Sequence, residues 1–335
     1  MRKMATIRNI DAIGPIEGAD AIEVATVGGW KVVVKKGEFK VGDRAVYCEI
    51  DSWIPTELAP FLSKGKEPRE FEGIKGERLK TIRLRGQLSQ GLLLNLDMAI
   101  PQTNSFVVGD DVSELLNIVK WEMPINAQLA GVVRGNFPTA IPKTDQERVQ
   151  NLTNEIGAAQ GMMFEVTEKL EGSSMTCYLL DGEFGVCSRN LDLKRDENNT
   201  MWKVAIDADI ENQMRKIGGN WAIQGEIVGP GIQGNIYKLK APALFVFDVY
   251  DIVGGDYLKP DVRRQLVKAL GLNHVPVLNT NFVLNGDVES LLIKAEGQSV
   301  MGDITGPERE GIVFKQADGG MTFKAISNKY LLGEK

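Results

Sequence analysis

Four charged residues in the second half of the chain lie in strongly apolar, strand-like segments. They are two lysines and two glutamates: Lys169, Lys324, Glu226 and Glu310. A deprotonated lysine amine is a nucleophile, and glutamate oxygens are ligands for Mg²⁺ or Mn²⁺. Each charge alone is consistent with an outward-facing residue of a half-exposed strand. Four such charges weaken that interpretation, because burying them is costly unless they are paired or used in chemistry.

The segments around these charges also follow a specific order along the chain. They resemble the motifs of the covalent nucleotidyltransferases, the superfamily of ATP-dependent ligases and mRNA capping enzymes. A Lys-x-(Asp/Glu)-Gly motif alone carries little information, whereas five elements in the right order are specific. The five elements are Lys169-Leu170-Glu171-Gly172, Gln224-Gly-Glu226-Ile-Val-Gly229, Leu244-Phe-Val-Phe247-Asp248, Glu310-Gly-Ile-Val-Phe and Phe323-Lys324.

The resemblance implies catalytic roles for these residues. Lys169 would attack the α-phosphorus of ATP and carry AMP, which requires a pKa lowered by burial or by nearby cations. Lys324 would help a metal ion to stabilise negative charge on the α-phosphate. The expected ligands of Mg²⁺ or Mn²⁺, partly through water, are Glu171, Glu226 and Glu310.

A second group of residues is expected to bind the nucleotide. By resemblance, Phe247 stacks on adenine, with Phe245 as the substitute if the register differs by two residues. Glu168 is expected at the adenine edge. The remaining expected nucleotide contacts are Leu170 beside it, Arg189 at a phosphate or ribose, and Arg148 at the triphosphate.

One position departs from the family pattern. The last motif of the family is often Lys-x-Lys, whereas here it reads Lys324-Ala-Ile326. Ile326 cannot replace a cation, so either Lys315 or Lys329 compensates or one phosphate contact is missing.

The pattern of apolar residues and turn signals predicts an α+β chain with two domains. Residues 1–118 read as short strands, with a hairpin at Gly28-Gly29, and fit an all-β, OB-like barrel that binds nucleic acid. Residues 119–160 read as a linker and connecting helix, since Thr144-x-x-Glu147 resembles a capping box that starts a helix towards Ile156. Residues 161–335 are expected to form a mixed α/β, ATP-grasp-like adenylyltransferase domain of antiparallel sheets, with flanking helices around 202–216 and 261–270.

The order of the domains indicates a branch of the superfamily. The chain ends eleven residues after Lys324, whereas DNA ligases and capping enzymes need a further barrel after this motif. An N-terminal barrel instead resembles the nick-sealing RNA ligases. That resemblance covers the whole chain. It implies an ATP-dependent enzyme that forms lysyl-AMP, transfers AMP to a 5′-phosphate and seals nicks in duplexes with RNA at the 3′-OH side.

Two other functions are compatible with the same motifs. One is an RNA 5′-end adenylyl- or guanylyltransferase that does not seal, which the nucleotide attached to Lys169 would distinguish. The other is a non-catalytic RNA-binding protein with the ligase fold. The four buried charges argue against that second function, because an inactive site has no use for them.

Composition gives weaker indications. The formal net charge is −6, so nucleic-acid binding needs a local basic stripe, for which Lys80, Arg83 and Arg85 are the candidates. On an acidic protein the same residues are also consistent with a solvated strand face. The chain shows no apolar run of bilayer length and no signal peptide, and we expect a cytoplasmic monomer.

Two further residue types limit the chemistry. The three cysteines, Cys48, Cys177 and Cys187, are too scattered for a disulfide framework or a thiolate metal site, so we expect reduced, buried thiols. The single histidine, His274, stands beside an apolar stretch and is expected to be a packing or surface residue. Hydrolase triads are therefore disfavoured.

Overall fold

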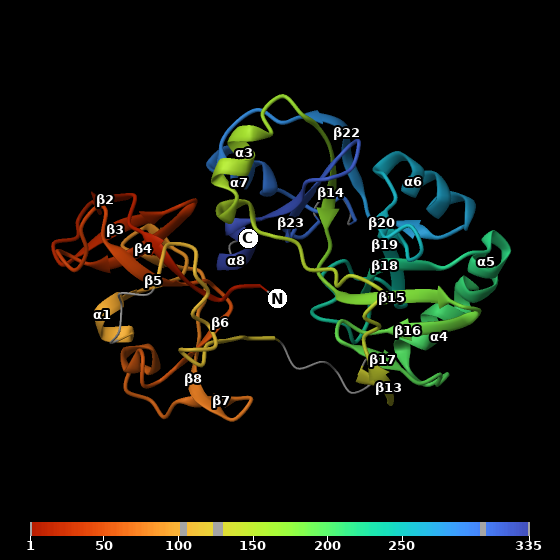
Figure 1. Cartoon of the computed structure of the whole chain (residues 1–335), viewed down its shortest axis with the longest axis horizontal. Coiled ribbons are helices and arrows are strands. Elements are labelled where there is room, and N and C mark those ends of the chain that lie inside the picture. The colour runs from red at the N-terminus through yellow and green to blue at the C-terminus, as the bar shows by residue number, and fades with distance from the viewer. Residues whose placement is uncertain (1, 101–105, 123–129, 302–305, 334–335) are drawn as a thin grey trace. The chain divides into compact units, whose positions relative to one another are not determined.

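The computed structural model describes residues 2–100, 106–122, 130–301 and 306–333. The chain forms two compact units, which Figure 1 shows in red to yellow and in green to blue. The N-terminal unit contains Met1–Met123, Gln150–Thr153 and Leu331–Glu334, and the second unit contains Pro124–Val149 and Asn154–Tyr330. Most of the segment 119–160 therefore belongs to the second unit.

The N-terminal unit consists of short antiparallel strands. The predicted hairpin at Gly28-Gly29 is confirmed, and Gly28 has a φ of +56°, which glycine adopts readily. The sheets are β1-β5-β11, β2-β3-β4, β12-β6-β8-β7 and β9-β10. Their strands are β1 (Ala5–Asn9), β2 (Ala12–Pro15), β3 (Ile22–Val27), β4 (Trp30–Lys35), β5 (Arg44–Cys48), β6 (Ser52–Pro55), β7 (Arg69–Phe71), β8 (Ile74–Arg78), β9 (Ile82–Leu84), β10 (Gln87–Ser89), β11 (Leu92–Asn95) and β12 (Val119–Lys120), with helix α1 (Leu96–Ala99) and a 3₁₀ turn at Pro60–Ser63.

Alternation along the strands builds the core of this unit. Trp30, Val32 and Val34 of β4 are buried, while Lys31 and Lys35 between and after them are exposed. Such a two-residue period places one face of each strand in the core, which is what the sequence pattern predicted.

The second unit contains two antiparallel sheets, apart from one parallel pairing of β19 with β21. One has the order β13-β17-β16-β15-β18-β19-β20, and the other has the order β22-β14-β23-β24. Their strands are β13 (Val133–Asn136), β14 (Met163–Lys169), β15 (Ser173–Leu180), β16 (Glu183–Cys187), β17 (Leu191–Leu193), β18 (Trp221–Val228), β19 (Ala243–Asp251), β20 (Asp256–Tyr257), β21 (Asn273–His274), β22 (Val277–Val283), β23 (Gly311–Gln316) and β24 (Thr322–Ile326).

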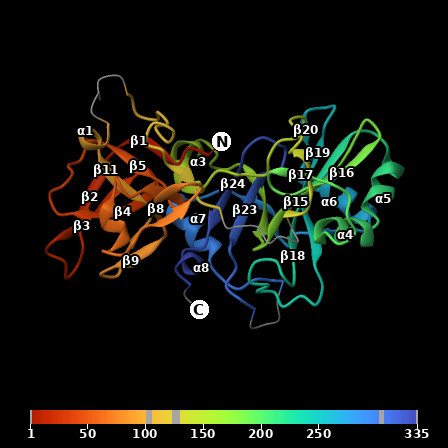
Figure 2. The same ribbon diagram turned by 90° about the horizontal axis from the view of Figure 1, so that it is seen from below.

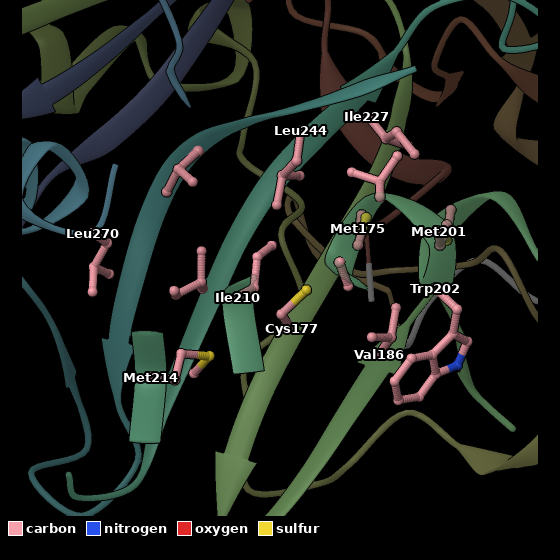
Figure 3. Packing of buried hydrophobic residues seen from close by; sticks show 14 of the residues in the cluster. Met175, Cys177, Val186, Met201, Trp202, Ile210, Met214, Ile227, Leu244 and Leu270 are labelled. Carbon is pink, nitrogen blue, oxygen red and sulfur yellow. The ribbon is translucent and has the colours of Figure 1, made fainter. Parts of the chain in front are cut away.

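Helices accompany both sheets. Figure 2 shows α7 close to β23 and β24, and Figure 3 shows Met201 and Met214 directed towards the buried Met175 and Cys177 of β15. The helices are α3 (Thr153–Ala158), α4 (Thr200–Asp207), α5 (Ile210–Ile217), α6 (Pro260–Ala269), α7 (Val288–Ala295) and α8 (Asn328–Leu332), with a 3₁₀ turn at Val149–Asn151.

Two helix predictions were wrong in detail. The expected helix around 202–216 is divided into α4 and α5, because Asp209 adopts a left-handed φ of 53°. No helix begins at Thr144. The Thr144 hydroxyl lies 2.9 Å from the Ser174 hydroxyl, and the Glu147 carbonyl accepts a hydrogen bond from the Lys324 amide of β24. This extended pairing uses a backbone group that a helix would need, so the first helical turns start only at Val149.

Cys48, Cys177 and Cys187 are buried free thiols, as predicted. Within the described residues, no helix has both the length and the apolar composition needed to cross a bilayer.

Candidate active site

Lys169 and Glu310 form the centre of the candidate site. Lys169 is the last residue of β14 and pairs with Gly311, the first residue of β23, so that Glu310 lies directly beside it. The Lys169 Nζ is 2.7 Å from Glu310 Oε1, and about a quarter of the lysine side chain is exposed. The strand register thus brings together two motifs that are far apart in sequence.

Two glycines of the motifs are required by close approach of the backbone. The segment after Lys169 crosses from the four-stranded sheet to β15 of the larger sheet (Figure 1). A Cβ atom on Gly172 would lie 2.4 Å from the Ile227 carbonyl oxygen, and one on Gly311 would lie 2.3 Å from that of Ala325. Any side chain at either position would push the crossing or the strand pair apart.

Glu226 brings a second carboxylate from the larger sheet. It lies on β18, paired with Ser174 and with Phe245. Burial, together with the charge of Glu310, raises the pKa of Glu226 to about 7 in spite of the opposing charge of Lys169. The two carboxylates are therefore close enough to repel each other.

The protonation of Lys169 differs from the sequence-based expectation. Burial favours a lower pKa for Lys169, but the charges of Glu310 and Glu226 outweigh it and raise the pKa above its ordinary value. Without a ligand that neutralises these carboxylates, Lys169 is held as an ammonium ion and is not a nucleophile.

Two more cations complete the charge pattern. Lys324 pairs with Val313 in β24, and its charge favours ionisation of Glu226. Arg148 forms a backbone bridge with Lys324, is 5% exposed, and its charge opposes protonation of Lys169. The tertiary structure therefore places Arg148 beside Lys324, so that both cations act on the pair of Lys169 and Glu226.

The two proposed substitutes for the missing lysine of that motif both pair with acidic side chains, but only Lys315 is buried, while the Lys329 side chain is half exposed. Ile326 is buried and pairs with Gly311. The Lys315 Nζ is 2.5 Å from Asp248 Oδ1, and the Lys329 Nζ is 3.1 Å from Glu296 Oε2. Burial lowers the pKa of Lys315 to about 8 despite the charge of Asp248.

Glu171 is fixed at its backbone and at both carboxylate oxygens. Its amide donates to Tyr237 Oη at 2.6 Å, Tyr330 Oη donates to its Oε2 at 2.9 Å, and the Gly234 amide lies 3.4 Å from its Oε1. Tyr237 and Tyr330 were not anticipated from the sequence, since neither stands in a motif.

An apolar group next to Lys169 matches the expected adenine contacts. Leu170, Phe245 and Phe247 belong to one cluster, so β19 directs both phenylalanines to the same side. Glu168 is 1% exposed and accepts hydrogen bonds from the Ser299 hydroxyl and, at 2.9 Å, from the Val300 amide. Burial, the largest effect, raises the pKa of Glu168.

A buried network of charges beneath Phe247 was also missed by sequence reasoning. The Lys315 ammonium donates to the Phe247 carbonyl at 2.6 Å and lies 5.6 Å from the centre of its ring. From Lys315 the network continues to its ion-pair partner Asp248 and from there to Arg263. Glu165 then pairs with both Arg263 and Arg264.

Arg189 lies at the margin of the site. Its Nη2 is 2.6 Å and 2.8 Å from the two carboxylate oxygens of Asp145, and its charge favours ionisation of Glu226. The structure therefore places Arg189 within electrostatic range of Glu226.

The residues present fit a hydrated divalent metal ion. Among the described residues no three His, Cys, Asp or Glu side chains form a ready metal cage, so the expected ligands Glu171, Glu226 and Glu310 are not gathered as three direct ligands, and the Glu171 carboxylate bonds to Tyr330 instead. Glu226 and Glu310 are hard oxygen donors whose mutual repulsion a cation would relieve. Such a pair suits Mg²⁺ or Mn²⁺, which keep several water ligands, better than a fully protein-bound ion.

His274 is a packed residue, as predicted. Its Nε2 accepts a hydrogen bond from Arg263 Nε at 3.1 Å, and its Nδ1 lies 2.6 Å from the Val275 carbonyl oxygen. Burial and the charge of Arg263 lower its pKa from 6.5 to about 4.

We therefore expect acid to destabilise the protein through His274. Because the folded state disfavours the imidazolium, this contribution is complete above pH ~6.5 and is lost as the pH falls towards 4. The free energy of unfolding should fall by about 2 kcal/mol between pH 7 and pH 5 through this group. Urea unfolding at both pH values would measure the fall, which should be smaller in His274→Gln. An equal fall in both proteins would contradict the expectation.

The basic residues of the N-terminal unit lie on a hairpin. Arg83 is on β9, but Arg85 is in the turn to β10 with a φ of 49°, so the two do not share a strand face as expected. The two-residue turn Arg85-Gly86 takes these residues out of the alternation of the strand. Lys80 and Arg85 are exposed, and no acidic residue occurs between Leu79 and Leu96.

Comparisons with known proteins agree with this arrangement. Residues 4–96 match a family model described as an OB-fold domain, and residues 162–330 match one described as RNA ligase. The chain is similar to structures of a Naegleria gruberi RNA ligase. One is a mutant without ligand, with 49% identity, a TM-score of 0.93 and coverage of 98% of this chain and 97% of that chain.

Two further structures of the Naegleria gruberi RNA ligase match as well. A mutant with ATP and Mn has 49% identity and a TM-score of 0.93, and 98% of each chain is covered. The structure with PPi has 49% identity and a TM-score of 0.93, with coverage of 99% of this chain and 98% of that chain. No match was found among curated proteins.

Proposed function

Since this chain belongs to the RNA ligase family, we propose that it is an ATP-dependent RNA ligase that carries AMP on Lys169 and seals nicks in RNA-containing duplexes. The observation that carries this proposal is the position of the Lys169 amine, 2.7 Å from Glu310 and within the fields of Glu226 and Arg148. A lone nucleophile among carboxylates and cations suits transfer of a nucleotide to and from its amine.

The first step joins Lys169 to AMP. The Lys169 ammonium first gives up one proton to solvent, the Nζ attacks the α-phosphorus, the bond from this phosphorus to the bridging oxygen breaks and pyrophosphate leaves, and a second proton is lost to solvent, so that the phosphoramidate nitrogen keeps one hydrogen. Lys324 and Arg148 supply positive charge for the phosphates. Glu226 and Glu310 would hold Mg²⁺ or Mn²⁺, which supplies further charge neutralisation and opposes the protonation of Lys169.

The nucleotide is proposed to bind beside β14. Leu170 and Phe247, with Phe245 as the alternative, offer an apolar surface for adenine, and the buried Glu168 carboxylate can accept a hydrogen bond from its amino group. The structures of the Naegleria gruberi RNA ligase with ATP and Mn and with AMP and Mn support the same nucleotide and metal for this chain.

The later steps use the nick. The 5′-phosphate oxygen attacks the phosphorus of lysyl-AMP and releases Lys169. The 3′-hydroxyl then attacks the activated 5′-phosphate and releases AMP. We propose that Lys80, Arg83 and Arg85 contact the duplex backbone, since they form a basic stretch without acidic neighbours in sequence on an acidic protein.

Sealing of synthetic nicks tests this function. With ATP and Mn²⁺, we expect sealing of a nick with an RNA 3′-hydroxyl strand, and weaker sealing when that strand is DNA. Transfer of AMP or GMP to 5′ ends without joining would contradict ligation and indicate a 5′-end transferase.

The same assay tests the basic hairpin. Replacing Lys80, Arg83 and Arg85 together by glutamine should weaken binding of the nick and flatten its dependence on salt, because each lost phosphate contact reduces counterion release. Lys31→Gln and Lys35→Gln on β4 are matched surface controls. Unchanged binding at several salt concentrations would exclude the hairpin as the contact.

A further inference from the structure

The short segment that follows the last lysine motif makes hydrogen bonds to two parts of the site. One is the stretch that leads into β23, and the other is Glu171. Ser327 donates its amide to the Glu310 carbonyl at 2.9 Å and its hydroxyl to Glu308 Oε1 at 3.0 Å. It also accepts the Tyr330 amide at 3.2 Å, which begins the turn of α8. These bonds anchor the segment to the residues that lead into β23.

The same turn directs the Tyr330 hydroxyl to Glu171. The Tyr330 Oη donates to Glu171 Oε2 at 2.9 Å across 159 residues of sequence. Tyr237 accepts the Glu171 amide at 2.6 Å. Glu171, two residues after Lys169, therefore has one carboxylate oxygen and its backbone fixed by two tyrosines from different parts of the chain.

This arrangement favours a single orientation of the carboxylate. A glutamate in the connection between two strands has several rotamers, and a hydrogen bond to its charged form selects one of them. With Oε2 bound to Tyr330, Oε1 can accept from the Gly234 amide, 3.4 Å away, and has lone pairs left for a water molecule. Besides burial, the charge of Glu310 raises the pKa of both Tyr237 and Tyr330, so both hydroxyls lie near the carboxylates of the site.

We propose that Tyr330 is a positioning residue for the adenylylation of Lys169, acting through Glu171 on the hydrated metal ion. This inference rests on the proposed function, which puts a hydrated metal ion at Glu226 and Glu310, and it adds Glu171, two residues after Lys169, as an acceptor for a water ligand of that ion. Removing a group that orients a metal ligand typically lowers metal affinity or activity 10- to 100-fold. Tyr330, which lies outside every motif, thus supports the first reaction step by orienting Glu171.

The variant Tyr330→Phe tests the proposal, because it keeps the ring and removes only the hydroxyl. In single-turnover reactions with ATP, we expect lysyl-AMP to form about 10-fold more slowly at low Mn²⁺, with part of the rate restored at high Mn²⁺. Mn²⁺ affinity, measured by electron paramagnetic resonance on the nucleotide-free protein, should fall as well. Tyr178→Phe is the matched control, since it removes a buried hydroxyl that donates to Asp192 at 2.9 Å.

A double-mutant cycle separates positioning from general support of the fold. If Tyr330 acts through Glu171, Tyr330→Phe should have little further effect on rate or Mn²⁺ affinity in a Glu171→Ala background. The proposal is overturned by wild-type rate and Mn²⁺ affinity in Tyr330→Phe, or by effects that simply add to those of Glu171→Ala. Loss of the proposed function itself would look different, since the wild type would then form no adduct on Lys169.

Discussion

Lys169→Ala should show no AMP adduct in intact-mass spectra after incubation with ATP and Mn²⁺, whereas the wild type gains the mass of one AMP. The reason is that the substitution removes the amine that lies 2.7 Å from Glu310 and within the fields of Glu226 and Arg148. Joining of a 5′-phosphate nick should be lost completely. Sealing of a pre-adenylated nick should survive, because its remaining step needs only attack by the 3′-hydroxyl.

Two variants control for charge and for surface effects. Lys169→Arg keeps the cation but should also form no adduct, while Lys203→Ala, at an exposed position of α4, should behave as the wild type. An adduct in Lys169→Ala would assign the nucleophile to another residue. Complete loss of sealing on the pre-adenylated nick would give Lys169 a role beyond carrying AMP.

Glu310→Gln should reduce the rate of lysyl-AMP formation at least about 100-fold. Two effects oppose each other in this variant. Removal of the charge 2.7 Å from the Lys169 Nζ lowers the pKa of that amine, which by itself would provide more nucleophile. The same change removes an oxygen donor for the metal and the group that orients the amine, and we expect this loss to dominate.

The pH dependence of adenylylation distinguishes the two effects. If orientation and metal binding dominate, Glu310→Gln stays slow from pH 6 to pH 9, and the exposed control Glu183→Gln resembles the wild type. A variant as fast as the wild type at neutral pH would mean that Glu310 serves only as the ion-pair partner of Lys169.

Local patterns were sufficient to predict several features. The strand pair around Gly28-Gly29 and the barrel before an α/β domain follow from residue periodicity and turn residues, whereas the candidate nucleophile follows from the resemblance of the ordered motifs to a known superfamily. Such features depend on neighbours within a few residues, so the sequence itself displays them. Hydrophobic spacing also indicated a helix around 202–216, although the left-handed Asp209 that divides it into two helices has no strong local signal.

The tertiary structure decided the rest. The failed helix at Thr144 is explained by pairing of Glu147 with Lys324, and the turn position of Arg85 by the tight hairpin. Contacts across long stretches of sequence, such as Glu168 with Ser299 at a separation of 131 residues, leave no local pattern.

The protonation state of Lys169 shows the same division between sequence and structure. The order of the motif residues along the chain is a property of the sequence alone. This order indicated the family and the candidate nucleophile. Whether burial or neighbouring carboxylates control the amine depended on the register of β14 with β23, which places Glu310 beside it, and on the charge of Glu226 from the other sheet, and the two together raise its pKa. Electrostatic energies vary with distance in space, and only the folded chain sets those distances.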